Sequence, residues 1–176
     1  MKIKNCTFNN SIYFNFLVSS QNCECWRSRS KRPSRSNWHY RNNKVDAIDF
    51  QTNGYVILLG YRLWGVGSGS TTFQVVIRLY RGSSLIAEKN GSYSTSSSVK
   101  TFEVHFSQRI AILAGVSYTA TVQKTTSARS FALSDGMAST SCSGLTVNFN
   151  DSSKDSNGSR QSQGQIPALI FRSSQC

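Results

Sequence analysis

The side chains that could perform chemistry are few and widely spaced in this 176-residue chain. Nucleophilic catalysis needs a Cys or Ser beside a His that an acidic group orients. The two histidines are His39 and His105, and His105 falls on the polar face of an expected strand. The sequence contains no nucleophile elbow. The sequence therefore offers no catalytic pair, and we expect a protein that is not an enzyme.

The carboxylates have no spacing typical of acid–base catalysis or of metal binding. Asp46 and Asp49 flank the start of an expected strand, where hydrogen bonds to turns or caps are the ordinary role of Asp. The run from Gly65 to Gly69 superficially resembles a phosphate loop, but such a loop needs a helix after the glycines. Because Thr71 begins an expected strand, we interpret the run as a flexible hairpin connection. We expect no catalytic residues, no metal and no cofactor.

The cysteines do not predict a disulfide framework. Their number is odd, and they stand at Cys6, Cys23, Cys25, Cys142 and Cys176. Cys23 and Cys25 are separated by a single residue, whereas zinc sites typically use CxxC pairs with a second pair downstream. We therefore expect reduced thiols in a cytoplasmic protein.

The elements that must position any site are strands. From Val45 onward, apolar and polar side chains alternate, which is the pattern of a half-buried strand. Thr71 to Tyr80 shows it best, and the stretches around Val104 and Ala120 repeat it. Three segments are apolar on both faces and predict central strands, namely residues 55–59, 110–113 and 168–171. With a turn former every 8 to 12 residues or so, the pattern predicts an all-β sandwich or barrel.

The positive charge is concentrated near the N-terminus. The formal net charge is +12, and residues 1–44 hold nine Lys or Arg against Glu24 alone. The Arg- and Ser-rich run 27–36 has little to bury, so we expect residues 1–37 to be a disordered basic tail and residues 38–176 to be the folded domain. No apolar run approaches the roughly 20 residues of a membrane-spanning helix, so we expect no membrane partner.

Five stretches together resemble the PHR domain, the β-sandwich module of the Pam, Highwire and RPM ubiquitin ligases and of certain BTB-domain proteins. The most specific is Gly164 to Phe171, which follows Asn157-Gly158. The others are Trp38-His39-Tyr40, Asp46 to Phe50, Gly60 to Gly65 and Ala114 to Ala120. The resemblance runs from about Trp38 to Arg172. Arg62 stands where the family usually has glycine.

The resemblance implies a two-sheet antiparallel, jelly-roll-like sandwich that recognises proteins, typically substrates for ubiquitin ligation. In the relatives a BTB region would engage a cullin ligase, or a RING region would supply catalysis. We therefore expect a cytoplasmic module that binds a substrate or a ligase component through loops at one end of the sandwich. Aromatic and Arg side chains are common at interface hot spots. The candidate contact residues are Trp38, Tyr40, Arg62, Trp64 and Gln165.

Two other functions stay open from the sequence. One is a nuclear, nucleic-acid-associated protein that acts through the basic tail, in which case binding would fall steeply with salt. The other is a secreted sandwich lectin or adhesin, which would require glycosylation at sites such as Asn90 and disulfide bonds.

Overall fold

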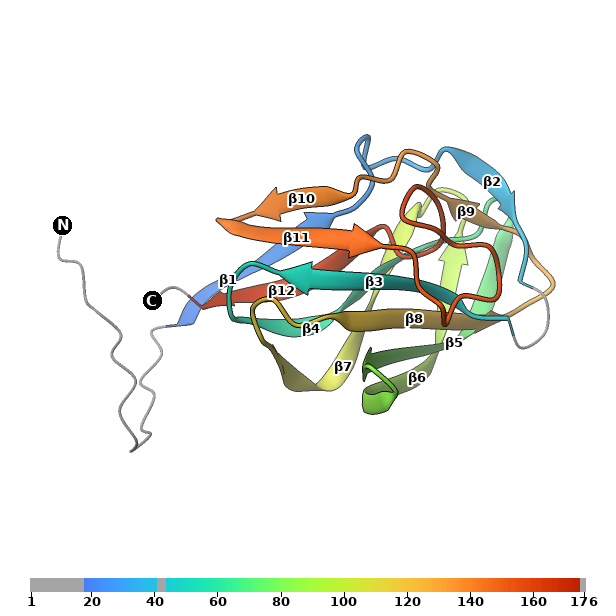
Figure 1. Cartoon of the computed structure of the whole chain (residues 1–176). Coiled ribbons are helices and arrows are strands. Elements are labelled where there is room, and N and C mark those ends of the chain that lie inside the picture. The colour runs from blue at the N-terminus through green and yellow to red at the C-terminus, as the bar shows by residue number, and fades with distance from the viewer. Residues whose placement is uncertain (1–17, 41–43, 175–176) are drawn as a thin grey trace, which may run out of the picture.

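Antiparallel strands build the whole described part of the protein. The computed structural model describes residues 18–40 and 44–174 (Figure 1). None of them forms a helix, and accordingly none belongs to a helix long and apolar enough to cross a membrane. The strands are β1 (Val18–Trp26), β2 (Arg35–Trp38), β3 (Asp46–Thr52), β4 (Val56–Trp64), β5 (Ser70–Arg81), β6 (Ser84–Ser96), β7 (Thr101–Ile112), β8 (Tyr118–Thr125), β9 (Ser130–Ala132), β10 (Ser139–Cys142), β11 (Leu145–Asn150) and β12 (Ala168–Ser174).

The strands form two main sheets that pack face to face. One has the order β1-β12-β4-β7 and the other the order β10-β11-β3-β8-β5-β6, while β2 and β9 make a small third ribbon. The two main sheets also approach each other at their edges, where β1 meets β10 and β6 meets β7. Figure 1 shows β2 along the end of the sandwich opposite the start of β1 and the end of β12. The expected all-β, two-sheet antiparallel sandwich is confirmed.

Alternation of side chains explains the core. In β5, Phe73, Val75, Ile77 and Leu79 are each at most 1% exposed, as the period-two pattern predicts. They face the apolar side chains of the other sheet, among them Leu58, Tyr61, Val104 and Phe171. Burial of each such side chain contributes about 1.5 to 3 kcal/mol, so these pairs of facing strands hold the sandwich closed.

Position within a sheet decides which apolar segments are central. Residues 168–171 are buried, and β12 lies between β1 and β4, so this segment forms a central strand as expected. Residues 110–113 were expected to form a central strand as well, and this is wrong. Residues 110–112 end β7 at the edge of its sheet, where Ala111 is exposed, and Leu113, which follows the strand, is 44% exposed.

The N-terminal region contradicts the expected domain boundary. Residues 1–17 lie outside the described residues, but β1 pairs along β12, and β2 pairs with β9. Strand β1 thus completes the four-stranded sheet, so the prediction of a disordered tail is wrong from residue 18 onward. The folded unit begins before residue 38.

The glycine run is a point of close packing instead of a flexible connection. A Cβ on Gly67 would lie 2.2 Å from the carbonyl oxygen of Ser36 in β2, and a Cβ on Gly65 would lie 2.4 Å from that of Val99. The amide of Gly67 donates to the carbonyl of Arg129 at 2.9 Å. Only glycine allows the main chains to come this close, and the contact seats β2 on the end of the sandwich.

Candidate partner-binding pocket and its buried support

A pocket of about 410 Å³ lies beside β2, at the end of the sandwich opposite the start of β1. Its charged side chains are the cations Arg35 and Lys44, both exposed, and its lining holds no carboxylate among the described residues. Amide, hydroxyl and imidazole groups complete the polar lining. The lining residues are Arg35, Asn37, Trp38, His39, Lys44, Ser156 and Asn157.

Asp46 lies behind the pocket and ties its walls together. Its Oδ1 accepts hydrogen bonds from Trp38 Nε1 at 3.1 Å and from Ser159 Oγ at 2.7 Å, and its Oδ2 accepts one from Asn157 Nδ2 at 3.0 Å. Burial raises the pKa of Asp46 to about 6, against the hydrogen bonds from Ser159 and Asn157, which lower it. One buried carboxylate therefore fixes both the β2 wall and the 156–159 wall.

Lys124 is the buried cation of the same region. Its Nζ donates to the carbonyl of Trp64 at 2.5 Å and to Gln165 Oε1 at 3.0 Å. The ammonium also lies 4.7 to 5.2 Å from the centres of the Phe73, Tyr40 and Phe102 rings. Burial lowers the pKa of Lys124 to about 7, and the charge of Asp46 opposes that shift. The residue supports the pocket from within, because it is only 2% exposed.

Gln165 and Ser130 continue this network into β9. Gln165 Nε2 donates to the carbonyl of Phe131 at 2.6 Å. Ser130 Oγ has one hydrogen to donate and lies within reach of two acceptors, the carbonyl of Gly65 at 2.8 Å and Gln165 Oε1 at 3.1 Å. These bonds satisfy polar groups that the core would otherwise leave unpaired, so they hold β9 against the end of β4.

Arg27 holds the 158–166 loop at the same end of the sandwich. It is 1% exposed, and its guanidinium donates to the carbonyls of Arg160 at 2.6 Å, Gln161 at 2.8 Å and Ile166 at 3.2 Å. Burial lowers the pKa of Arg27 to about 10, so the side chain stays charged at neutral pH. It belonged to the expected basic tail, but here it is a structural cation that shapes the 158–166 loop.

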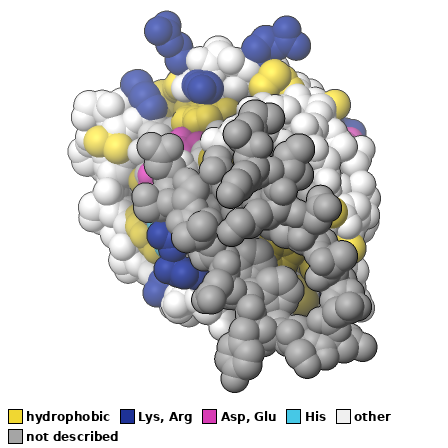
Figure 2. Space-filling model, turned by 90° about the vertical axis from the view of Figure 1, so that its left-hand side faces the viewer, with side chains coloured by type: hydrophobic (Ala, Val, Ile, Leu, Met, Phe, Trp, Pro, Cys, Tyr) yellow, Lys and Arg dark blue, Asp and Glu magenta, His cyan; other side chains and the backbone are white. Residues whose placement is uncertain are grey.

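The rest of the basic run is exposed. Arg29, Lys31 and Arg32 lie in the β1–β2 connection. Figure 2 shows Lys and Arg side chains along the upper edge of the molecule, the side on which Figure 1 places this connection. The connection is fixed at its base, since Ser28 Oγ and the amide of Ser30 donate to the Asp135 carboxylate at 3.0 and 2.8 Å. It is therefore a held loop and not a free tail.

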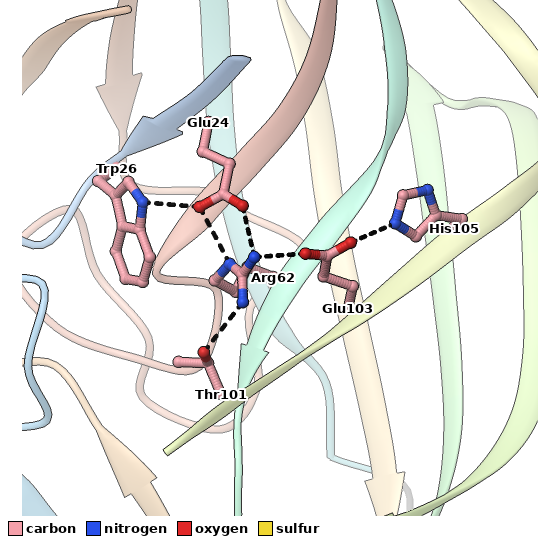
Figure 3. Close-up of polar contacts among 6 residues, drawn as sticks. All are labelled: Glu24, Trp26, Arg62, Thr101, Glu103 and His105. Atoms are coloured by element: carbon pink, nitrogen blue, oxygen red, sulfur yellow. Dashed lines mark hydrogen bonds and ion pairs between the residues drawn. The ribbon is translucent and has the colours of Figure 1, made fainter. Parts of the chain in front are cut away.

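Arg62 belongs to a second polar cluster, on the outer face of the four-stranded sheet (Figure 3). Its guanidinium pairs with Glu24 of β1 and Glu103 of β7, and it lies 5.7 Å from the ring centre of Trp26. Glu103 also contacts His105 at 2.7 Å, and Arg62 Nη1 donates to Thr101 Oγ1 at 3.2 Å. The ion pairs join three strands of one sheet. Their solvent exposure limits what each contributes to stability.

The five expected contact residues do not form one exposed surface. Trp64 and Gln165 are fully buried and Tyr40 is 8% exposed, so the expectation of surface contacts is wrong for these three. Each instead packs around or hydrogen-bonds with the Lys124 network. Arg62 is on the surface with its side chain 17% exposed, but it is engaged by carboxylates away from the pocket. Trp38 is 9% exposed and is one of the residues that line the pocket.

Of the pocket residues that the sequence did not single out as contacts, Arg35 and Asn37 stand in β2, and the others stand in loops. Arg35 looked like one charge of a basic run, and His39 was a possible catalytic base and part of the stretch Trp38-His39-Tyr40. Ser156 and Asn157 looked like turn formers. Nothing in the sequence indicated that Asp46 and Lys124 support a common pocket, because their contacts join segments far apart in the chain. The aromatic Trp38 was the one usable indication.

The cysteine prediction also needs correction. Cys6 and Cys176 lie outside the described residues. Among the others, the sulfur of Cys142 in β10 is in bonding contact with those of Cys25 and Cys23 in β1, so these three are not isolated free thiols. Strand β1 was missed in the sequence, and with it the contact between the edges of the two sheets.

Two comparisons with known proteins indicate the same family. The sequence profile of the PHR domain matches residues 28–172. BTB/POZ domain-containing protein 3 of Mus musculus is 32% identical over 147 residues, which cover 84% of this chain and 28% of that protein. BTB/POZ domain-containing protein 6 of Homo sapiens is 31% identical over 154 residues, and protein 6-A of Danio rerio 30% over 154; each match covers 88% of this chain and 28% of the relative.

The profile match begins at Ser28, ten residues before the resemblance that could be seen by eye, which agrees with the inclusion of β2 in the fold. The chain spans about 28% of the length of the relatives it matches. From the profile match and the identity to these relatives, the chain belongs to the PHR domain family.

Proposed function

We propose that this PHR domain is a non-catalytic protein-recognition module that binds an acidic segment of a partner protein in the pocket beside β2. The observation that carries the proposal is the lining of the pocket, in which Arg35 and Lys44 meet no carboxylate among the described lining residues. Two cations with an aromatic side chain and several hydrogen-bonding groups suit an extended segment rich in Asp, Glu or phosphorylated residues.

The rigidity of the walls supports binding. Asp46 holds Trp38 and Asn157 from behind, so these two lining residues are fixed before a partner arrives. A pocket that is already formed pays less ordering entropy on binding. Loops on a β scaffold can also change in sequence without disturbing the core, which suits a recognition site.

Binding without catalysis is supported by the surroundings of the two buried groups with strongly shifted pKa values. Asp46 and Lys124 are at most 2% exposed and are engaged by the protein itself, so neither is placed to meet a substrate. The family assignment supports a protein-interaction module in general. We further propose a cytoplasmic location, with a ubiquitin-ligase component or substrate as the partner.

The test is fluorescence anisotropy with a short peptide rich in Asp and Glu, beside the same peptide with Lys at each acidic position. We expect the acidic peptide alone to bind. Lys44→Glu should weaken binding about tenfold or more, since about 1.4 kcal/mol corresponds to a factor of ten. The matched control is Arg109→Glu, an exposed charge reversal on β7, which should leave the affinity unchanged.

Two results would contradict the proposal. One is an equal loss of affinity in the Lys44→Glu and Arg109→Glu variants, which would reduce the binding to net charge. The other is a single-stranded oligonucleotide that binds at physiological salt as tightly as the acidic peptide, which would favour a nucleic-acid partner and the exposed basic loop.

A further inference from the structure

Three cysteines from opposite sheets converge at the edge of the sandwich. Cys23 and Cys25 stand two residues apart on the inward face of β1, and Cys142 ends β10. Their three sulfur atoms all lie within 4.8 Å of one another. The sulfur of Cys142 is in bonding contact with both of the others, but a sulfur can have only one disulfide partner at a time. The site thus holds two mutually exclusive pairs around Cys142.

The backbone suits either pair. The Cα atoms of Cys25 and Cys142 are 5.2 Å apart, and those of Cys23 and Cys142 are 6.0 Å apart. Both distances fall inside the range of about 4.4 to 6.8 Å that disulfides span, so neither pair requires the strands to move. Because side chains two apart on a strand share a face, both β1 thiols point at the same partner.

Access differs among the three thiols. Cys25 is fully buried and Cys23 is 6% exposed, whereas Cys142 is half-buried at the end of an edge strand, just before the turn at Ser143 and Gly144. A small reagent therefore meets Cys142 first, and the two buried thiols lie directly behind it. This is the arrangement of an accessible thiol that reacts first, with resolving thiols next to it.

We propose that Cys142 is a covalent modification site for low-molecular-weight disulfides such as oxidised glutathione, and that Cys25 and Cys23 are its alternative resolving thiols. The Cys142 thiolate attacks one sulfur of oxidised glutathione, forms a mixed disulfide and releases one glutathione thiolate. The thiolate of Cys25 or Cys23 then attacks the Cys142 sulfur and releases the second glutathione.

The step balances without another reagent. Two protein thiols lose two electrons and two protons, and one oxidised glutathione becomes two reduced glutathione molecules. The remaining β1 thiol can then attack the Cys142 sulfur, take over the bond and free its neighbour, with no net oxidation.

The bond would have a structural consequence for the outer face of the sheet. Glu24 and Trp26 alternate with the two cysteines along β1 and hold Arg62 on the outer surface (Figure 3). A link from Cys25 or Cys23 to Cys142 therefore fixes the strand that carries this cluster. It also joins β1 to β10, the outermost strands of the two sheets on that side.

The experiment uses the full chain with Cys6→Ser and Cys176→Ser, so that the only cysteines are the three in question. The reduced protein is incubated with oxidised glutathione, quenched with acid, alkylated and analysed by peptide mass spectrometry. We expect both Cys25–Cys142 and Cys23–Cys142 linkages, with little glutathione left on the protein. Adding Cys25→Ser should leave only the Cys23–Cys142 linkage, and adding Cys23→Ser only the Cys25–Cys142 linkage.

Cys142→Ser in the same background should abolish formation of the linkages and protect the two buried thiols from modification. Circular dichroism checks that this variant folds, and Cys142→Ala provides a second replacement if it does not. The proposal is overturned if Cys142 of the folded protein resists concentrations of oxidised glutathione that modify it in urea. A stable glutathione adduct without resolution would also overturn it. So would one tightly held zinc ion per chain after purification with a reductant, because the three thiols would then be metal ligands.

Discussion

At the scale of single residues, the pocket depends on two buried charges that do not touch each other. Asp46 accepts three hydrogen bonds, and Lys124 donates two and lies against three aromatic rings. Burial raises the pKa of Asp46 and lowers the pKa of Lys124, and each charge opposes the shift of the other group. Each charge therefore lowers the cost of burying the other. Removal of one partner should therefore be costly, because it leaves the other charge buried without compensation.

Asp46→Ala tests this dependence. The free energy of unfolding should fall by about 3 to 5 kcal/mol, because three donors lose their acceptor and the buried Lys124 loses the opposite charge of Asp46. Asp46→Asn should cost less, about 1 to 3 kcal/mol, since an amide oxygen can still accept from Trp38 and Ser159. Urea denaturation measures both. Asp49→Asn, which alters a carboxylate that accepts a hydrogen bond from Thr119 Oγ1, is the control and should cost less than either. Equal losses for Asp46→Ala and Asp49→Asn would refute a special role of Asp46.

The pKa of Lys124 predicts a pH dependence with a definite sign. In the unfolded chain the pKa returns to 10.5, and in the folded protein it is about 7. Between these values the unfolded state binds one more proton, so stability rises as pH rises from 7 to 9, by up to about 1.4 kcal/mol per pH unit. Asp46 acts in the opposite sense, since its stability contribution is lost as pH rises from 4 through about 6, so the test stays above pH 7.

Lys124→Met should remove that rise. Urea denaturation at pH 7, 8 and 9 should give the wild-type protein an increasing free energy of unfolding and the variant a nearly constant one. Parallel pH profiles for the two proteins would show that Lys124 does not lose its proton in this range, and that its ammonium is better compensated than the contacts indicate.

At the scale of elements, the sequence predicted most strands well, but it predicted poorly which strands lie side by side in a sheet. The alternation from Phe73 to Leu79 was readable because β5 has one face in the core. Strand β7 was misjudged because its apolar end lies at a sheet edge, and whether a strand is at an edge depends on pairing with distant residues. Strand β1 was missed because its apolar face consists of cysteines beside a dense basic run. The alternation of Cys23, Glu24, Cys25 and Trp26 was the available sign.

Gly67→Ala tests the close packing of β2 against Gly67. Its Cβ would meet the Ser36 carbonyl at 2.2 Å, so β2 must shift away from the end of the sandwich. We expect a clear loss of thermal stability, by calorimetry, together with weaker binding of the acidic peptide. Gly54→Ala is the matched control, because its Cβ would meet only Leu145 at 3.9 Å, an ordinary contact. A Gly67→Ala protein with unchanged melting temperature and affinity would contradict this view of the pocket.

At the scale of the whole molecule, the pocket is a product of long-range assembly. Its walls come from Arg35, residues 37–39, Lys44 and residues 156–157, and its support comes from β3, β8 and the 158–166 loop. A sequence pattern can indicate Trp38 as an aromatic at a strand end. It cannot bring Asn157 to Asp46, because that contact depends on the closure of the complete sandwich.

Removal of residues 1–37 should therefore unfold the protein instead of trimming a tail. The shortened chain loses β1, which pairs with β12, and Arg27, which donates hydrogen bonds to the 158–166 loop. We expect residues 38–176 to aggregate or to lack a cooperative transition in circular dichroism and size-exclusion chromatography. Residues 18–176, which keep every described strand, should melt cooperatively. A shortened chain 38–176 with native-like melting would restore the boundary expected from the sequence.

The most direct test of the recognition site is photo-crosslinking in cytosol with p-benzoylphenylalanine placed at Asn37 in the pocket or at Ser83 in the exposed β5–β6 turn. The account predicts that Asn37 crosslinks to an acidic segment of a discrete partner, that Ser83 does not, and that Lys44→Glu removes the Asn37 product. Identical products from both positions, or an Asn37 product that persists with Lys44→Glu, would contradict the assignment of this pocket as the partner-binding site.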